Sequence, residues 1–220
     1  ERMGQRMKQD NPGRLVGYHP FGRTSSSLWF HEAKWLDFNL FQSGHRRYDQ
    51  TELGAWDDNA AAEGCFGEDC WRYVERDYGK KPAKPVLDGE PSYEWVVQGL
   101  HDKKQPYWKA ADVRRYAYWN VFAGAAGHTY GHNSIMQFYD NLSEEGAFGA
   151  RYLWSDAVHH PGGAQMIHLK RLMQSVDFTH GRPAEDYLLE EQGEKYDYIS
   201  VFAGEDFLFA YTYTGRTISL

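Results

Sequence analysis

Four short apolar runs alternate with longer stretches that can form helices, and this order constrains the fold more than any other feature of the sequence. The runs are bounded by Gly, Pro or His residues and span residues 14–20, 36–45, 85–91 and 128–138. Strands that are apolar along their length and separated by helices are typical of a parallel sheet covered on both faces. The order therefore predicts an α/β fold, which half of a (β/α)8 barrel or a small open sheet would both satisfy.

Two of the intervening stretches have clear helical patterns. One helix is expected to begin near Asp112, a suitable N-cap, and to end at Gly124 and Gly127. A second helix is expected over residues 163–178, where Met, Leu and Val form one apolar stripe. The segment 56–78 is expected to be partly helical, with glycines interrupting it.

The pattern changes after Pro183. Residues 196–203 and 207–214 alternate apolar and polar side chains on either side of the sequence Gly-Glu-Asp at 204–206. This pattern predicts an antiparallel hairpin. We therefore expect residues 184–220 to begin a separate all-β module.

Composition excludes several classes of partner. The chain has 220 residues, with 24 Lys and Arg against 31 Asp and Glu and a net charge of -7, and it has no basic run. Nucleic acid is therefore not an expected partner. No apolar stretch approaches the roughly 20 residues that cross a bilayer. The amino end is neither a signal peptide nor an initiator start, so we expect a piece of a longer chain, with any targeting signal outside it.

The only two cysteines, Cys65 and Cys70, lie five residues apart. A small disulfide loop and two free buried thiols are both compatible with this spacing. The pair therefore indicates no cellular compartment.

Polar side chains follow each of the four predicted strands. In a βα barrel the carboxyl ends of the strands converge on one face, where active sites are built. One shared pocket is therefore expected. Its candidate residues are Tyr18 and His19, then Gln42, Ser43 and His45, then Asp88 and Glu90, and then Tyr130 and His132.

Glu90 is the strongest single candidate. It follows the apolar pair at 86–87, and Pro91 ends the strand directly after it, so its carboxylate is expected to point into the mouth of the barrel. A carboxylate placed there is a candidate nucleophile or general base. The neighbouring carboxylates Asp88 and Glu94 can serve function, or can instead cap the next turn or pair with arginines at 114 and 115.

Aromatic side chains are concentrated at or just after the strand ends. Sugars present apolar C–H faces and many hydroxyls, so a pocket of rings, carboxylates, Gln and His suits a carbohydrate. At least half of the rings are expected to be core packing instead. They are Tyr18, Trp29, Phe30, Trp35, Tyr93, Trp95, Tyr130 and Trp154.

The ten histidines raise the question of a metal site. His128 and His132 are four residues apart, but they lie on a predicted strand and lack the HExxH helix and its Glu. Ser43 lacks the G-x-S-x-G elbow of a serine nucleophile. We therefore expect neither a metal nor any other cofactor.

Five ordered segments resemble the successive motifs of the apiosidase-like glycoside hydrolases, family 140. Together they cover about the first 180 residues of the chain. They are YHP at 18–20, WLDFNLFQSGH at 35–45, KPVLDGEPSYE at 84–94, DVRR at 112–115 and AGAAGHTYG at 123–131.

The resemblance implies a (β/α)8 TIM-barrel glycosidase followed by a small β-sandwich of the kind described as collagen-binding. Bacterial members remove apiose-linked units from plant pectic side chains, so a periplasmic or secreted protein is expected. Residues 1–183 would be the C-terminal half of the barrel, and 184–220 the start of the sandwich. Glu90 matches the carboxylate of the seventh strand and would be the nucleophile. The acid/base Asp would precede Glu1, in the missing N-terminal half of the barrel.

Two features depart from the family pattern. Met136 occupies a position where the family commonly has Trp, so a sugar-stacking ring is expected to be absent there. The segment 56–78 is longer than usual. Both departures bear on the choice of substrate.

The mechanism expected from these features is glycoside hydrolysis by two carboxylates through an oxocarbenium-like transition state. Retention of configuration is expected. The residues expected to hydrogen-bond the sugar hydroxyls are His19, Gln42, His45, Tyr93 and Tyr130, and those expected to hold Glu90 in place are Asp88 and Arg114.

Two rival functions remain open on the sequence alone. The first is a non-catalytic carbohydrate-binding protein on the same scaffold, because a fold does not determine a function. The second is a metal-dependent hydrolase that uses His128, His132 and Asp88.

Overall fold

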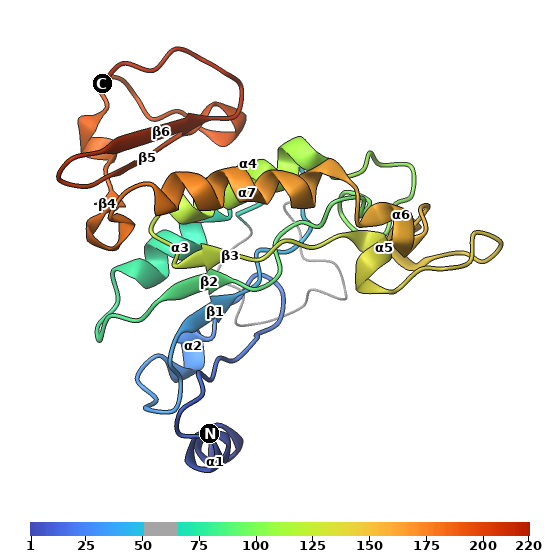
Figure 1. Cartoon of the computed structure of the whole chain (residues 1–220), viewed down its shortest axis with the longest axis horizontal. Coiled ribbons are helices and arrows are strands. Elements are labelled where there is room, and N and C mark those ends of the chain that lie inside the picture. The colour runs from blue at the N-terminus through green and yellow to red at the C-terminus, as the bar shows by residue number, and fades with distance from the viewer. Residues whose placement is uncertain (51–65) are drawn as a thin grey trace.

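The computed structural model describes residues 1–50 and 66–220 of the chain. Over these ranges the protein is a mixed α/β structure with one parallel and one antiparallel sheet, each of three strands. The parallel sheet lies at the centre, the antiparallel sheet lies above it at the C-terminal end, and the N-terminal helix α1 (Arg2–Asp10) lies at the opposite end (Figure 1). Residues 56–65 of the segment expected to be partly helical, which include Cys65, lie outside the described residues.

The parallel sheet consists of β1 (Asn39–Phe41), β2 (Val86–Asp88) and β3 (Gly127–His128) in that order. The predicted parallel pairing is confirmed. The register pairs Phe41 with Asp88, and Asp88 with His128. The carboxyl ends of all three strands therefore lie side by side at one edge, which we call the carboxyl edge.

Helices connect these strands as the sequence pattern predicts. The connection from β1 to β2 contains α3 (Trp71–Tyr78), and the connection from β2 to β3 contains α4 (Ala110–Phe122). The helix α7 (Pro161–Gln174) follows β3 and lies alongside α4 (Figure 1). Both long helices expected from the sequence are thus confirmed, within a few residues at each end.

The start of α4 differs from its prediction. The helix begins at Ala110, and Asp112 is its third residue rather than its N-cap. The carboxylate Oδ2 of Asp112 accepts the backbone N–H of Lys109 over 2.9 Å. Asp112 therefore stabilises the first turn from inside the helix, where its negative charge also complements the helix dipole.

The core between α3 and the parallel sheet is made of apolar side chains from both. Phe41 is fully buried and stacks on Tyr73 with 5.3 Å between ring centroids. Val74 and Val86 complete the contact between helix and sheet. Burying one such side chain contributes about 1.5–3 kcal/mol, so α3 fixes the position of β1 and β2.

The first predicted strand, 14–20, is wrong. The Val16 N–H donates to Asp37 Oδ2 over 2.6 Å, and the Val16 carbonyl accepts a hydrogen bond from the Asp37 N–H over 2.9 Å. The Arg14 N–H donates to the Asn11 carbonyl over 3.0 Å. These isolated hydrogen bonds form no strand ladder. The segment runs without regular structure to the short helix α2 (Ser27–Phe30).

The predicted strand over 128–138 is also wrong beyond His128. Residues Asn133–Met136 form the helix α5. His132 caps it, because its Nδ1 accepts the backbone N–H of Ser134 over 3.1 Å. Met136 therefore lies on a helix, 44% exposed, and not on a barrel strand. Another short helix, α6 (Trp154–Ala157), follows, with a 3-10 turn η1 (Ala147–Gly149) between the two.

The predicted hairpin is confirmed. The strands β5 (Ile199–Ala203) and β6 (Leu208–Thr212) pair antiparallel, and β4 (Arg182–Pro183) pairs with the other edge of β5. The sheet thus takes a short strand from before position 184. The 3-10 turns of this part are η2 (Phe178–His180), η3 (Glu185–Tyr187) and η4 (Lys195–Asp197).

The antiparallel sheet packs on α4 through aromatic rings. Phe122 of α4 stacks with Phe202 of β5 at 6.1 Å and with Phe209 of β6 at 6.2 Å between centroids. Leu169 and Met173 of α7 join the same cluster. Helix α4 is therefore buried between the two sheets, which explains why it lacks a polar face.

None of the helices within residues 1–50 and 66–220 is both long and apolar enough to cross a membrane.

Candidate active site

Glu90 lies at the carboxyl edge, two residues beyond the end of β2. Its backbone is held on both sides: its N–H donates to Asp88 Oδ1 over 3.2 Å, and its carbonyl accepts the Gly44 N–H over 2.9 Å. Its side chain is 28% exposed. The loop after β1 and the end of β2 thus fix the backbone of Glu90 while its carboxylate stays accessible.

Two histidines face the Glu90 carboxylate. His45 Nε2 lies 3.4 Å from Oε1, and His19 Nε2 lies 3.8 Å from Oε2. The Nδ1 of His45 accepts the backbone N–H of Tyr93 over 3.3 Å, so the neutral ring carries its proton on Nε2. His45 therefore points an N–H toward Glu90.

Asp88 lies beneath Glu90 and is fully buried. It accepts hydrogen bonds from Ser43 Oγ over 2.5 Å and from Asn120 Nδ2 over 3.1 Å, besides the backbone N–H groups of Ser43 and Glu90. Burial raises the pKa of Asp88 to about 7, against the lowering effect of these hydrogen bonds. Asp88 therefore fixes the loops that carry Ser43 and Glu90, and it carries a proton for part of the time near neutral pH.

Tyr93 lies next to this group. Its ring meets the His45 ring edge to face, with 5.0 Å between centroids. Burial, with the charge of Glu90 adding to it, raises the pKa of Tyr93 to about 12, so its hydroxyl keeps its proton. The Cβ of any residue other than glycine at 131 would lie 2.2 Å from the Tyr93 ring. Gly131 therefore makes room for this ring.

Tyr130 and Gln42, both expected to contact the sugar, have hydrogen-bond partners other than Glu90. The Tyr130 hydroxyl donates to Glu94 Oε2 over 2.6 Å, which ties it to a second, buried carboxylate. Gln42 is half-buried, and its backbone is bonded to residues 23 and 24. Both residues follow strands of the parallel sheet, but no hydrogen bond between described residues joins either one to Glu90.

Arg114 is not brought to Glu90. It lies on α4, and its Nη1 donates to Gln165 Oε1 on α7. The neighbouring Arg115 pairs with Glu68 over 2.5 Å, rather than with Asp88 or Glu94. Arg114 thus joins α4 to α7, and Arg115 joins α4 to the loop before α3.

Sequence reasoning missed the residues that satisfy the buried carboxylates. Asn120 is fully buried on α4 and donates to Asp88 across 32 positions of sequence. Its signal was a single amide inside an otherwise apolar and aromatic turn. Glu94 is 1% exposed and accepts the Gly162 N–H over 3.3 Å, and no local pattern reveals that contact.

The histidines of the metal hypothesis have separate environments. His128 is half-buried, and the desolvation of its ring lowers its pKa to about 3. His132 Nε2 lies 2.9 Å from His160 Nδ1. Within the described part of the chain, no group of three His, Cys, Asp or Glu side chains is placed to hold a metal ion.

Cys70 is a free, fully buried thiol that lies 3.8 Å from the Tyr116 carbonyl oxygen. Burial raises its pKa well above the ordinary value, which makes the reactive thiolate scarce. Cys70 is therefore structural.

A carboxylate at the carboxyl edge of parallel βα units, flanked by imidazole and phenol groups, is typical of glycoside hydrolases. The chain belongs to the family described as "Apiosidase-like, catalytic domain", whose model matches residues 1–180. This confirms the resemblance found in the sequence motifs.

Two solved structures support the assignment. One, described as "Glycoside hydrolase", is 49% identical with a TM-score of 0.91, and the match covers 98% of this chain and 48% of that one. The other is a glycoside hydrolase family 5 from Bacteroides vulgatus ATCC 8482, 44% identical with a TM-score of 0.89, covering 98% of this chain and 45% of that one. The chain thus spans about half the length of these structures. No match was found among curated proteins.

Proposed function

We propose that the full-length protein hydrolyses glycosidic bonds in plant pectic oligosaccharides, with Glu90 as the nucleophile. The observation that carries this proposal is the placement of the Glu90 carboxylate at the carboxyl edge, accessible to solvent and facing His19 and His45. Family membership and the glycoside hydrolase neighbours support the reaction class.

The proposed reaction has two steps. In the first, a Glu90 oxygen forms a bond to the anomeric carbon, while the bond to the leaving oxygen breaks and that oxygen takes a proton from an acid. In the second, water donates a proton to the same group and replaces Glu90, which leaves as a carboxylate. The overall result is retention of configuration. We propose that the acid/base carboxylate belongs to the rest of the barrel.

In this scheme His45 orients the Glu90 carboxylate. Its Nε2–H points toward the Glu90 carboxylate, because Tyr93 fixes the tautomer. His19, Gln42, Tyr93 and Tyr130 would then contact the sugar hydroxyls. Asp88 would keep the Glu90 loop in place through its backbone hydrogen bonds.

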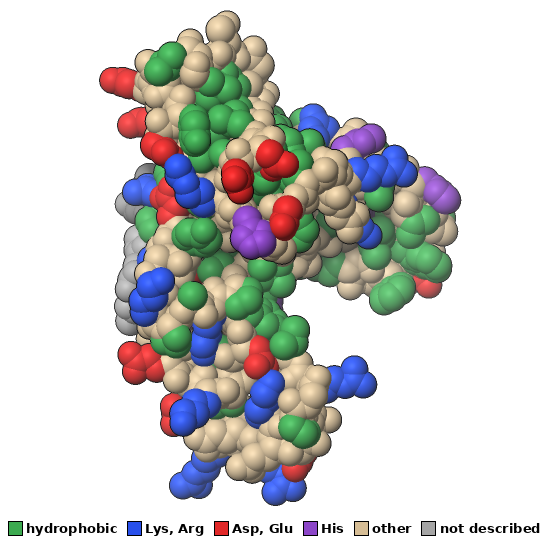
Figure 2. Space-filling view, turned by 60° about the vertical axis from the view of Figure 1, so that its left-hand side comes forward, with side chains coloured by type: hydrophobic (Ala, Val, Ile, Leu, Met, Phe, Trp, Pro, Cys, Tyr) green, Lys and Arg blue, Asp and Glu red, His purple; other side chains and the backbone are tan. Residues whose placement is uncertain are grey.

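We also propose that residues 1–183 form the C-terminal half of a (β/α)8 barrel and that residues 184–220 begin a β-sandwich. Among the described strands, β3 pairs on one side only, with β2. Beside β3 lies a cavity of about 720 Å³ lined by apolar side chains of α7 and by residues 124–128. Figure 2 shows hydrophobic side chains around the hollow at mid-height of the molecule. A further βα unit from the N-terminal half of the barrel would cover such a surface.

A periplasmic or secreted location belongs to the same proposal. The proposed substrate is its only support, because an enzyme that acts on a plant polysaccharide encounters this substrate outside the cytoplasm.

The test is Glu90→Gln in the full-length protein, assayed on pectic oligosaccharides. The amide keeps the shape of the side chain but cannot act as a nucleophile, so we expect kcat to fall by at least about a thousandfold. Glu205→Gln, an exposed change in the β5–β6 turn, is the matched control and should keep full activity. Unchanged turnover by Glu90→Gln would refute the assignment.

A further inference from the structure

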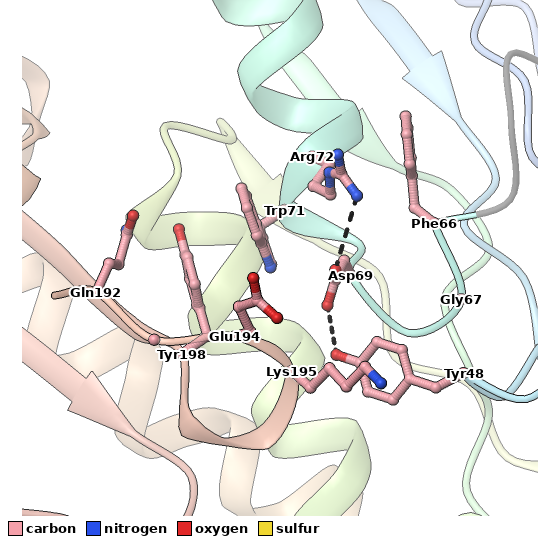
Figure 3. A pocket seen from close by; sticks show the side chains of 11 residues that line it. Tyr48, Phe66, Gly67, Asp69, Trp71, Arg72, Gln192, Glu194, Lys195 and Tyr198 are labelled. Atoms are coloured by element: carbon pink, nitrogen blue, oxygen red, sulfur yellow. Dashed lines mark hydrogen bonds and ion pairs between the residues drawn. The ribbon is translucent and has the colours of Figure 1, made fainter.

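A second cavity lies between the parallel and antiparallel sheets, away from Glu90. Its volume is about 420 Å³, within the range of small-molecule sites. One wall comes from the start of α3 and the residues before it, and the other comes from residues 192–195 and Tyr198 (Figure 3). The second wall lies beyond residue 180, where the family match ends. We call this cavity the junction pocket.

Aromatic rings give the junction pocket a rigid wall. Trp71 stacks on Tyr198 with 4.2 Å between centroids and 8° between ring planes. Trp119 meets the other side of Tyr198 edge to face, at 5.6 Å. Tyr198 is only 1% exposed, so this stack is held by the core. The apolar wall is therefore in place before any ligand arrives.

Three residues that line the junction pocket each have a buried polar atom that is unsatisfied. The Trp71 Nε1, Gln192 Nε2 and Tyr198 hydroxyl find no hydrogen-bond partner among the described residues. Buried donors are nearly always paired, because an unpaired one costs about 1–3 kcal/mol. A ligand with oxygen acceptors would satisfy the Trp71 N–H, which points toward the Glu194 side of the pocket (Figure 3).

The charged groups at the pocket balance one another. The carboxylates of Asp69 and Glu194 are matched by the cations of Arg72 and Lys195. Asp69 accepts the Tyr48 hydroxyl and lies 4.0 Å from Arg72 Nη1 (Figure 3). In Figure 3 the Trp71 indole nitrogen and the Glu194 carboxylate both point toward the middle of the pocket. Because the two signs cancel, the pocket favours a neutral ligand that both donates and accepts hydrogen bonds.

We propose that the junction pocket binds a neutral sugar unit of an oligosaccharide, at a position separate from Glu90. A sugar ring presents an apolar face to Trp71 and hydroxyls to Gln192, Asp69 and Glu194. The choice of a sugar as the ligand rests on the proposed function, and the pocket itself rests on its geometry. The loop after β1 supplies both His45 of the candidate active site and Tyr48 of the junction pocket, so the two sites share one segment.

The experiment measures binding by the full-length protein carrying Glu90→Gln, so that no ligand is hydrolysed. The probes are neutral arabino-oligosaccharides and galacto-oligosaccharides, titrated by calorimetry. Trp71→Phe keeps the ring stack but removes the indole N–H, and Gln192→Ala removes the amide. Each change should weaken one binding event about tenfold, the effect of losing a hydrogen bond of about 1.4 kcal/mol.

The matched control is Glu191→Gln, a carboxylate on the same loop that does not line the pocket. It should leave the titration unchanged, and melting temperatures should show that all variants remain folded. Identical titrations for Trp71→Phe, Gln192→Ala and Glu191→Gln would overturn the proposal. So would binding of oligogalacturonate alone, since that ligand is charged.

Failure of this proposal and failure of the proposed function give different results. Hydrolysis is measured with Glu90 intact, and the pocket is measured by binding without turnover. A protein that binds neutral sugars through Trp71 and Gln192 but hydrolyses no glycoside would support the pocket and refute the hydrolase. A protein that hydrolyses pectic oligosaccharides, but whose sugar binding is unaffected by these variants, would support the hydrolase and refute the pocket.

Discussion

The carboxyl edge and the region between the two sheets both bury carboxylates, but they use them differently. Between the sheets, Glu68 accepts Arg115 Nη2 over 2.5 Å and the Tyr196 hydroxyl over 2.8 Å. At the carboxyl edge, the hydrogen-bond donors that Asp88 finds among the described residues are neutral, and Glu90 lies 3.4 Å from the nearest histidine nitrogen. The Glu68 carboxylate is neutralised by Arg115 and joins two parts of the chain, whereas the Glu90 carboxylate stays accessible and available for chemistry.

The largest effect is expected when the ion pair between the sheets is broken. Arg115→Met leaves the carboxylate of Glu68, which is 2% exposed, without its cation. Removing one partner of a buried pair costs about 3–5 kcal/mol, so the urea midpoint of the full-length protein should fall strongly. The exposed Arg171→Met on α7 is the control and should change the midpoint little.

A double variant sharpens this result. Arg115→Met with Glu68→Leu removes both charges, and an apolar pair of similar volume is often neutral for stability. The double variant should therefore be more stable than Arg115→Met alone. If it were equally unstable, the loss would come from packing around α4 and not from an uncompensated charge.

The next effect concerns the dependence of stability on pH. Burial holds the pKa of Asp88 at about 7 in the folded protein, above its ordinary value of 3.8. Between about pH 4 and pH 7 the unfolded chain has therefore lost this proton while the folded chain retains it. Stability falls as the pH rises through this window, by up to about 4 kcal/mol at 1.36 kcal/mol per pKa unit.

Asp88→Asn removes this titration. Its free energy of unfolding, measured in urea at pH 4.5 and 7.5, should change less between the two pH values than that of the unmodified protein. Asp206→Asn, an exposed change in the β5–β6 turn, should keep the original slope. An unaltered slope in Asp88→Asn would assign the pH dependence to other groups.

The sequence was sufficient for the parallel units, the two long helices and the hairpin, because each follows from local periodicity. It also placed Asp88 and Glu90 at the carboxyl edge, since Asp88 ends an apolar strand and Glu90 lies two residues beyond it, while their roles stay a prediction. It failed at 14–20, where the Val16 backbone bonds to Asp37 and not to a neighbouring strand, and at 133–136, where a helix capped by His132 replaces the predicted strand.

The contacts that complete both regions join distant positions. Asn120 reaches Asp88 across 32 residues, and Arg115 reaches Glu68 across 47. Nothing in the local pattern around Arg115 distinguishes Glu68 from the nearer carboxylates Asp88 and Glu94. Such pairings depend on how α4 is rotated between the two sheets, and that rotation is set by packing.

The smallest effect is expected from a change at His45. It tests whether the side chains of the carboxyl edge orient the Glu90 carboxylate for reaction. His45→Gln keeps a polar side chain of similar length but loses the ring held between Tyr93 and Glu90. Groups that orient a reacting carboxylate typically contribute 10-fold to 100-fold, so we expect kcat on pectic oligosaccharides to fall by about that factor. The KM should change less, because the contact is to Glu90 and not chiefly to the sugar.

His168→Gln, an exposed change on α7, is the control and should leave both kcat and KM unchanged. A rise in KM at constant kcat would instead make His45 a sugar-binding residue, and Glu90 would then depend on its backbone hydrogen bonds alone for its position.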